Sequence, residues 1–232
     1  MKRIVFVFLF LVLAILSKSQ KLELFYDFNL GIPTATSLRN FHSNLKEQVP
    51  LENFKTQDNF NYYYGFTVGA RINHNVSIYF NNKVTGAKSS IADYSGYVRI
   101  TNELIGYSYG LKYEFYKVDF SKGQIRFGAK GFVTRSELIL RTESKLFTNS
   151  DSEKFEFKSI DFGCGIGINY EYSFMFIIFK AYLDFDIVYG GKISLKENNY
   201  DDAYLMDENG DKITTCWSGI KLGIGFSIPL FK

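Results

Sequence analysis

The last stretch of the chain, residues 214–232, constrains the fold most, because its residues alternate in character with a period of two. One alternate set is mostly apolar: Cys216, Ser218, Ile220, Leu222, Ile224, Phe226, Ile228 and Leu230. The other is mostly small, polar or charged: Thr215, Trp217, Gly219, Lys221, Gly223, Gly225 and Ser227. A period of two predicts a β-strand with one set on each face. Glycine weakens a water-facing strand, so we expect the glycines inside a tight closed barrel and the apolar face outside, in lipid.

Seven earlier segments alternate in the same way. They cover residues 21–31, 60–72, 76–84, 97–116, 124–140, 159–172 and 177–189. The sixth is the clearest, with Gly163, Gly165 and Gly167 on one face and Ile166 and Ile168 on the other. Together with the last stretch they predict eight strands.

The connections between these segments alternate between long and short along the whole chain. Outer-membrane barrels have this pattern, with long extracellular loops, short periplasmic turns, an even number of strands and both termini in the periplasm. We therefore predict an all-β fold, an eight-stranded antiparallel up-and-down transmembrane β-barrel, that forms a single domain over residues 21–232.

The last strand also resembles the C-terminal insertion signal of bacterial outer-membrane barrels. Lys221, Gly223, Phe226 and Ile228 match its polar, glycine, aromatic and hydrophobic positions in order, although Pro229 and three more residues follow where the family usually ends on an aromatic. Over residues 21–232 the chain resembles the small barrels of the OmpA/OmpX type. The resemblance implies an outer-membrane location, contact with outer-membrane lipid, insertion by the barrel-assembly machinery, a possible envelope protein partner, and a structural or surface-interaction role without catalysis.

Residues 1–20 read as a cleaved signal peptide. A basic start, Met1-Lys2-Arg3, precedes an apolar run of 13 residues at 4–16, which is too short for a membrane-spanning helix of about 20 residues. Cleavage after Gln20 resembles secreted proteins of the Bacteroidota. It would remove Lys2, Arg3 and Lys18, so that Lys+Arg falls from 27 to 24 and equals Asp+Glu at 24. A neutral mature chain gives no reason to expect a nucleic-acid partner.

The inward face of the predicted barrel carries charges of both signs. They are Glu23, Asp27, Arg71, Lys83, Lys112, Glu114, Arg126, Lys130, Asp161, Glu171, Lys180, Asp184, Asp186 and Lys221. An eight-stranded barrel is just wide enough to be filled by side chains, and buried charges are tolerated when they are paired. We expect a salt-bridged lumen network that closes the barrel; the alternative is a path for protons or ions.

Two histidines offer the sequence's candidates for chemistry. His74 falls in a predicted turn, and His42 falls in the first extracellular loop. There Ser37 or Ser43 and an acid from another loop could join His42 in an outer-membrane lipid-modifying enzyme or protease. The same loop has Leu38, Phe41, Leu45 and Val49 at helical spacing before Pro50. This spacing predicts either a short amphipathic helix over the barrel mouth or an irregular loop.

No cofactor or metal site is expected. Cys164 and Cys216 lie on outward faces with a whole strand between theirs, which argues against a disulfide. The acidic residues at 207–211 lack the ligand spacing and closing glutamate of an EF-hand. The remaining alternative to a membrane barrel is a secreted soluble barrel of the lipocalin type, which would bind an apolar ligand inside and place its apolar faces inward.

Overall fold

The computed structural model describes residues 22–47, 54–73, 75–195, 203–207, 209–215 and 217–230. The predicted signal peptide, His74 and Cys216 lie outside these ranges. The elements are β1 (Leu22–Pro33), α2 (Thr36–Glu47), β2 (Lys55–Asn59), β3 (Tyr63–Ile72), β4 (Val76–Asp93), β5 (Gly96–Asp119), β6 (Gly123–Leu146), β7 (Asn149–Phe174), β8 (Ile177–Tyr189), β9 (Ser194–Leu195) and β10 (Gly219–Pro229).

Eight of these strands close into a ring. The order β4-β3-β1-β10-β8-β7-β6-β5 returns to its start because β4 also pairs with β5. The first and last barrel strands pair along their length, from Glu23 opposite Pro229 to Pro33 opposite Gly219. Each of these pairings is antiparallel. The predicted fold class, an all-β, eight-stranded antiparallel up-and-down barrel, is therefore confirmed.

The barrel has its apolar residues outside and its charged residues inside, as the strand pattern predicts. Ile224 is 67% exposed and Ile166 is 63% exposed, whereas Lys221 is 6% exposed. The inward glycines leave room for larger lumen groups. A side chain at Gly223 would meet the ring of Tyr182, and one at Gly167 would meet the carboxylate of Asp184. An outer wall of this kind requires lipid around it, and ring closure leaves no unpaired strand edge there.

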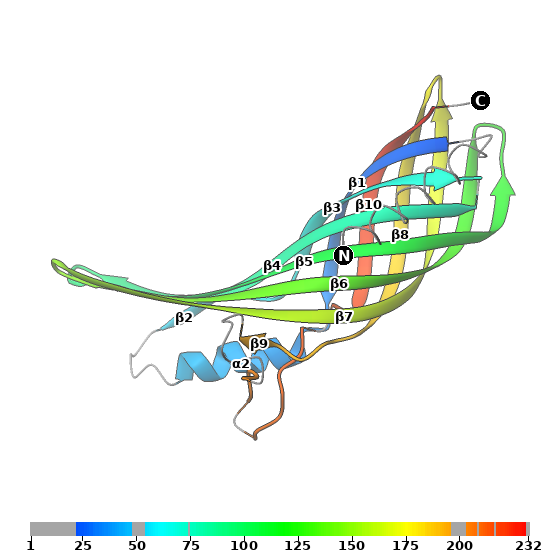
Figure 1. The fold of residues 1–232 in the computed structure, drawn as a ribbon. Helices are drawn as coiled ribbons and strands as arrows, with labels where there is room; N and C mark the ends of the chain where they lie inside the picture. The colour runs from blue at the N-terminus through cyan, green and yellow to red at the C-terminus, as the bar shows by residue number, and fades with distance from the viewer. Residues whose placement is uncertain are drawn as a thin grey trace, which may run out of the picture.

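The two ends of the barrel differ. At one end, here called the short-turn end, β10 finishes beside the β5–β6 and β7–β8 turns (Figure 1). At the other, the long-loop end, β4, β5, β6 and β7 continue well beyond the barrel as a projecting sheet.

The sequence predicts loops at 86–95 and 141–154, and both predictions are wrong, because β-strands occupy most of these two segments. A run of polar residues in a sequence suggests a loop. Here the polar residues face solvent on one side of the extended strands and pair between neighbouring strands, as Arg99 and Glu143 do at 3.6 Å. The opposite side carries Ile100, Leu104 and Leu138, which are buried.

A cap, formed by α2 and by a small hairpin from the last long loop, lies under the projecting sheet and over the barrel mouth. The helix predicted from the spacing of Leu38 and Phe41 is present as α2, which lies beneath the sheet in Figure 1. Among the described residues, no helix is both long and apolar enough to cross a membrane. The last long loop adds a small hairpin, in which Leu205 N donates to Ile193 O at 2.9 Å and Ile213 N donates to Leu205 O at 2.9 Å.

A hydrophobic core forms where the cap meets the sheet and the barrel mouth. It contains Ala35, Leu38, Phe60, Tyr63, Ala87, Leu104, Phe132, Leu138, Phe157, Val188, Ile193, Ile213 and Trp217. Phe60, which the alternation places on the outer face of a strand, lies in this core and is fully buried. The barrel strand β3 begins only at Tyr63, because Phe60 turns the chain with a φ of 52°.

The orientation of the wall can be tested with two adjacent residues of β7. Ile166→Arg should cost about 2–4 kcal/mol of folding stability in bilayers, because it places a charge in lipid. Ile166→Leu should change little, whereas Gly167→Leu should destabilise, because its bulk meets Asp184 in the lumen. Urea unfolding in lipid vesicles measures all three. A harmless Gly167→Leu together with a damaging Ile166→Leu would mean that the wall is reversed.

Candidate functional site

The lumen contains a cluster of buried ion pairs centred on two arginines. Arg71 Nη1 lies 2.9 Å from Glu23 Oε2, Arg71 Nη2 lies 3.2 Å from Glu114 Oε1, and Arg71 also pairs with Glu171. Arg126 contacts Glu114 at 2.9 Å and Glu171 at 3.1 Å. The two guanidinium groups thus share the same carboxylates, an arrangement that suits the planar, multi-donor arginine side chain.

Neutral and lysine side chains complete this arginine cluster. Lys112 lies 3.7 Å from Glu114, and Lys180 lies 3.2 Å from Glu23. Glu171 also accepts hydrogen bonds from Gln124 at 2.6 Å and Asn169 at 2.7 Å. We did not predict the two amides, although both occupy inward positions in the alternation. Because Glu171 is fully buried, these donors replace the water that its oxygens lose.

A second ion-pair cluster lies farther along the lumen and contains two aspartates of β8. Lys130 Nζ contacts Asp184 Oδ2 at 2.6 Å and Asp186 Oδ1 at 2.8 Å, and Lys221 Nζ contacts Asp184 Oδ2 at 3.3 Å. Asp184 and Asp186 point inward together because they are two residues apart in a strand. Strands β6, β8 and β10 each supply part of this cluster, so it ties three strands together.

A cavity of about 50 Å³ lies in the lumen and touches both clusters, since Arg71, Asp184 and Lys221 all line it. Asp27, predicted as part of the network, also lines it, and its Oδ1 has no hydrogen-bond partner among the described residues. Tyr182 Oη, which is also buried, likewise has no hydrogen-bond partner among the described residues. A polar cavity of this size has room for a few water molecules, which would satisfy these atoms.

Asp161 departs from the predicted pattern, because among the described residues its partners are hydroxyl and amide groups and not a cation. Its oxygens accept hydrogen bonds from Ser136 Oγ at 2.6 Å, Ser159 Oγ at 3.0 Å, Thr215 Oγ1 at 2.6 Å and the Gly191 amide at 2.7 Å. Four donors can stabilise a buried carboxylate without an ion pair.

Lys83, another inward lysine, has aromatic neighbours. Its Nζ lies 4.4 Å from the ring centre of Trp217 and 5.6 Å from that of Phe132. Trp217 in turn donates from Nε1 to Ser136 Oγ at 2.9 Å, which links it to the Asp161 site. We did not predict this cation–π contact, because it joins residues far apart in the sequence.

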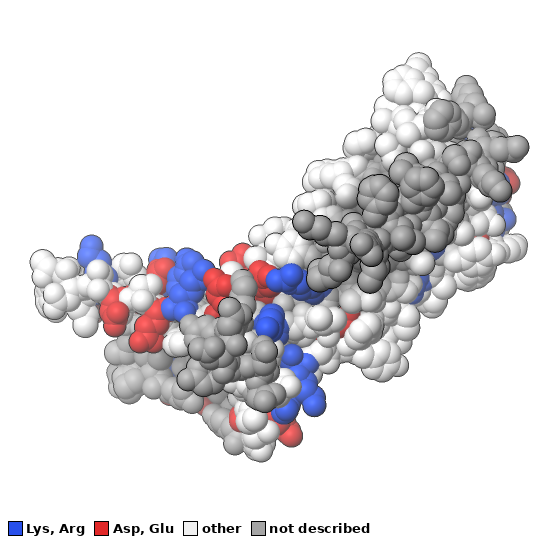
Figure 2. Space-filling model, in the orientation of Figure 1, with Lys and Arg blue, Asp and Glu red and all other residues white. Residues whose placement is uncertain are grey.

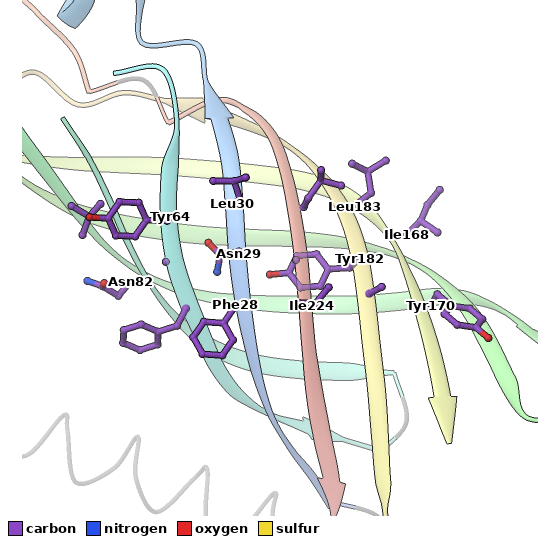
Figure 3. Close-up of a pocket in the computed structure, with 16 residues that line it drawn as sticks. Phe28, Asn29, Leu30, Tyr64, Asn82, Ile168, Tyr170, Tyr182, Leu183 and Ile224 are labelled. Carbon is purple, nitrogen blue, oxygen red and sulfur yellow. The ribbon is translucent and has the colours of Figure 1, made fainter. Parts of the chain in front are cut away.

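The outer wall is apolar over the strands on both sides of the β1–β10 junction. Phe28, Leu30, Ile168, Leu183 and Ile224 border a shallow hollow there (Figure 3). Aromatic rings extend the wall toward β3, where Tyr26 stacks with Phe66 at 6.1 Å between ring centres.

The four residues of the predicted insertion signal lie on both faces of β10. Lys221 and Gly223 point inward, where a side chain at Gly223 would meet Tyr182. Phe226 is on the outer wall, 6.0 Å from the ring of Tyr26, and Ile228 is partly exposed there. Recognition of these residues during insertion stays a prediction.

His42 is fully buried between α2 and the projecting sheet. Asn102 Nδ2 donates to its Nδ1 at 2.9 Å, its Nε2 donates to Ser89 Oγ at 2.8 Å, and Ser89 Oγ donates to Thr56 Oγ1 at 3.2 Å. This donor order requires a neutral imidazole. Burial, and to a lesser extent the nearby charge of Lys46, lower the pKa of His42 from 6.5 to about 4, while Asp58 acts in the opposite direction.

The catalytic alternative named Ser37 or Ser43 as the partner of His42, and both are wrong. The structure pairs His42 with Ser89, on β4, because the helix turns this histidine toward the sheet. A serine and a histidine that are both fully buried offer no access to a substrate. In the described part of the chain, no group of three or more His, Cys, Asp or Glu is arranged to hold a metal ion.

Comparisons with known proteins give no match by sequence and a distant likeness to a solved structure. No protein-family model and no curated protein matches the sequence. Among solved structures, the chain is similar to the crystal structure of Neisserial surface protein A (NspA), with 13% identity, 89% of this chain and 96% of that chain covered, and a TM-score of 0.35. The fold assignment above rests on strand pairing and does not depend on this likeness.

The arginine cluster predicts a large effect from a small change at Glu171. Glu171→Gln keeps the shape but leaves Arg71 and Arg126 short of one buried carboxylate, and it should cost about 3–5 kcal/mol of stability. Glu143→Gln is the matched control, because Glu143 forms partly exposed pairs with Arg99 and Arg141, and it should cost less than about 1 kcal/mol. Urea unfolding compares the two variants. Equal costs would mean that the buried cluster contributes no more than a surface pair.

The buried histidine predicts that acid weakens the contact of α2 with the sheet. The closed state has α2 packed on the sheet, and there the pKa of His42 is about 4; in an open state, with α2 detached, the pKa returns to 6.5. Between these two pH values the open state therefore binds a proton that the closed state does not bind. The closed state should therefore lose on the order of 3 kcal/mol as pH falls from 6.5 to 4. Hydrogen exchange of the α2 amides, corrected for intrinsic rates, measures this loss. His42→Gln, which cannot titrate, should abolish the pH dependence; an unchanged pH profile in that variant would refute it.

Proposed function

We propose that this chain is an outer-membrane β-barrel protein with a structural or surface-interaction role and no catalytic activity. The observation that carries this proposal is the reversed polarity of the barrel: Ile166 and Ile224 are exposed on the wall, whereas Glu171 and Asp184 are buried in the lumen. Only a lipid environment favours that arrangement, and the outer membrane is where closed barrels of this size are found.

The proposal includes a route to the membrane. Residues 1–20 act as a cleaved signal peptide, and the barrel-assembly machinery reads Lys221, Gly223, Phe226 and Ile228. The place of these residues supports this, because β10 is the strand whose pairing with β1 closes the ring. In this proposal the short-turn end faces the periplasm and the long-loop end faces the outside of the cell. The protein would be a small barrel of the OmpA/OmpX type in the envelope of a Bacteroidota-like bacterium.

The lumen network closes the barrel in this proposal. Arg71, Glu114 and Glu171 fill one part of the lumen, and Lys130 and Asp184 fill another. The hydrophobic core around Leu38 and Trp217 covers the mouth. A lumen filled in this way suits a structural role better than a path for ions, and it leaves no apolar interior for a ligand of the lipocalin kind.

The projecting sheet is the part best placed to meet a partner. Its hairpin tips carry Tyr94, which is completely exposed, and Phe147, which is 74% exposed. Charged side chains gather over the sheet and the loops beneath it (Figure 2). An envelope or surface protein is the partner we propose.

Localisation and topology can be tested together in cells. The protein should stay in the membrane fraction after carbonate extraction and should migrate faster on gels when it is not heated. An epitope tag inserted after Tyr94 should be cleaved from intact cells by added protease, whereas a tag after Ser121 should be protected until the outer membrane is opened. A carbonate-soluble protein would overturn the outer-membrane assignment, and a reversed protection pattern would overturn the orientation.

A further inference from the structure

An apolar surface, here called the turn knob, lies at the short-turn end of the barrel. It consists of Phe120 from the β5–β6 turn and Phe174, Met175 and Phe176 from the β7–β8 turn. Their exposed fractions are 55%, 52%, 85% and 66%. Three consecutive large apolar side chains at the tip of a hairpin are unusual in a protein surrounded by water, because such a tip exposes a contiguous apolar surface.

The chemistry of the β7–β8 turn does not suit an aqueous turn. Phe174 pairs with Ile177, so Met175 and Phe176 form a two-residue loop, a position that usually selects Asn and Gly. Met175 adopts a φ of 54°, a conformation that larger residues rarely take. The β3–β4 turn at the same end follows the aqueous preference, since it has Asn73 and Asn75. The apolar residues of the turn knob therefore serve a purpose other than turn formation.

The turn knob continues the apolar outer wall. Along β7 and β8 the outward residues are Tyr170 and Phe174 on one strand and Phe179 on the other, with Tyr172 opposite Phe179, and none of them is charged. The β5–β6 turn lies beside this hairpin, because Ser173 N donates to Lys122 O at 3.0 Å. The wall thus reaches the hairpin tip without a polar break, and what contacts the wall can also contact the knob.

We propose that the turn knob inserts into the boundary between headgroups and acyl chains of the periplasmic leaflet and anchors this side of the barrel in the membrane. The inference rests on the proposed outer-membrane function. The occupant is lipid because the knob is continuous with a lipid-facing wall and carries phenylalanine and methionine side chains, whose wholly apolar surfaces are buried at the boundary between headgroups and acyl chains. The anchor is one-sided, since the β3–β4 turn has asparagines in the equivalent place.

Tryptophan reporters in phosphatidylcholine vesicles test the proposal. The chain has one tryptophan, Trp217, which is buried and supplies a constant background. Phe176→Trp reports on the knob with an aromatic exchange, and Met175→Trp is a second reporter. Ile166→Trp reports on the middle of the wall, and Tyr94→Trp, at a fully exposed hairpin tip, reports on water. Heat-modifiable migration shows that each variant has folded.

The expected result is a difference between quenchers. Emission added at 176 should be blue-shifted, lost with phosphatidylcholine brominated on its acyl chains, and resistant to aqueous acrylamide, as at 166. Emission added at 94 should show the reverse. If 166 responds to brominated lipid but 175 and 176 respond only to acrylamide, the knob faces water and is free for a periplasmic protein, and the inference fails. If 166 does not respond to brominated lipid, the membrane barrel itself fails.

Discussion

Pairing of every backbone edge is the constraint on which the rest of this structure depends. Lipid offers no hydrogen bonds to free amide and carbonyl groups, so a sheet can lie in it only when its first and last strands meet. Here β1 and β10 meet from Glu23 opposite Pro229 to Pro33 opposite Gly219. Closure at eight strands then determines a narrow lumen, and the narrow lumen determines that glycines such as Gly167 and Gly223 must face it.

The lumen network follows from that narrowness. Charged side chains that are enclosed by eight strands cannot keep their water, and each needs a partner or several donors. Arg71 and Arg126 meet this need by sharing Glu114 and Glu171, whereas Asp161 meets it with hydroxyls and an amide. The network is therefore both a filling for the barrel and a set of cross-links between strands that are distant in the sequence.

Beyond the barrel mouth the same chain uses the ordinary solution for proteins in water. The projecting sheet places Leu104 and Leu138 against the cap and its charged residues on the other face. His42 joins the helix to the sheet through neutral hydrogen bonds and not through a charge. The polarity of the strands β4 to β7 thus reverses along their length, from apolar outside in the barrel to apolar inside above it, because the surrounding solvent changes.

The sequence by itself determined the number of barrel strands, their antiparallel order, the outward apolar face and the inward position of the charges. A period of two is a local property of each strand, so it can be recognised without knowing which other strands lie beside it. The short helix could also be predicted, from the spacing of Leu38 and Phe41. Only the tertiary structure decided the partners. That Asp161 binds Thr215, that Lys83 lies over Trp217, that Phe60 turns inward and that His42 meets Ser89 and not Ser37 all depend on residues brought together by strand register and tilt. Those contacts join positions far apart in the chain, and no local pattern records them.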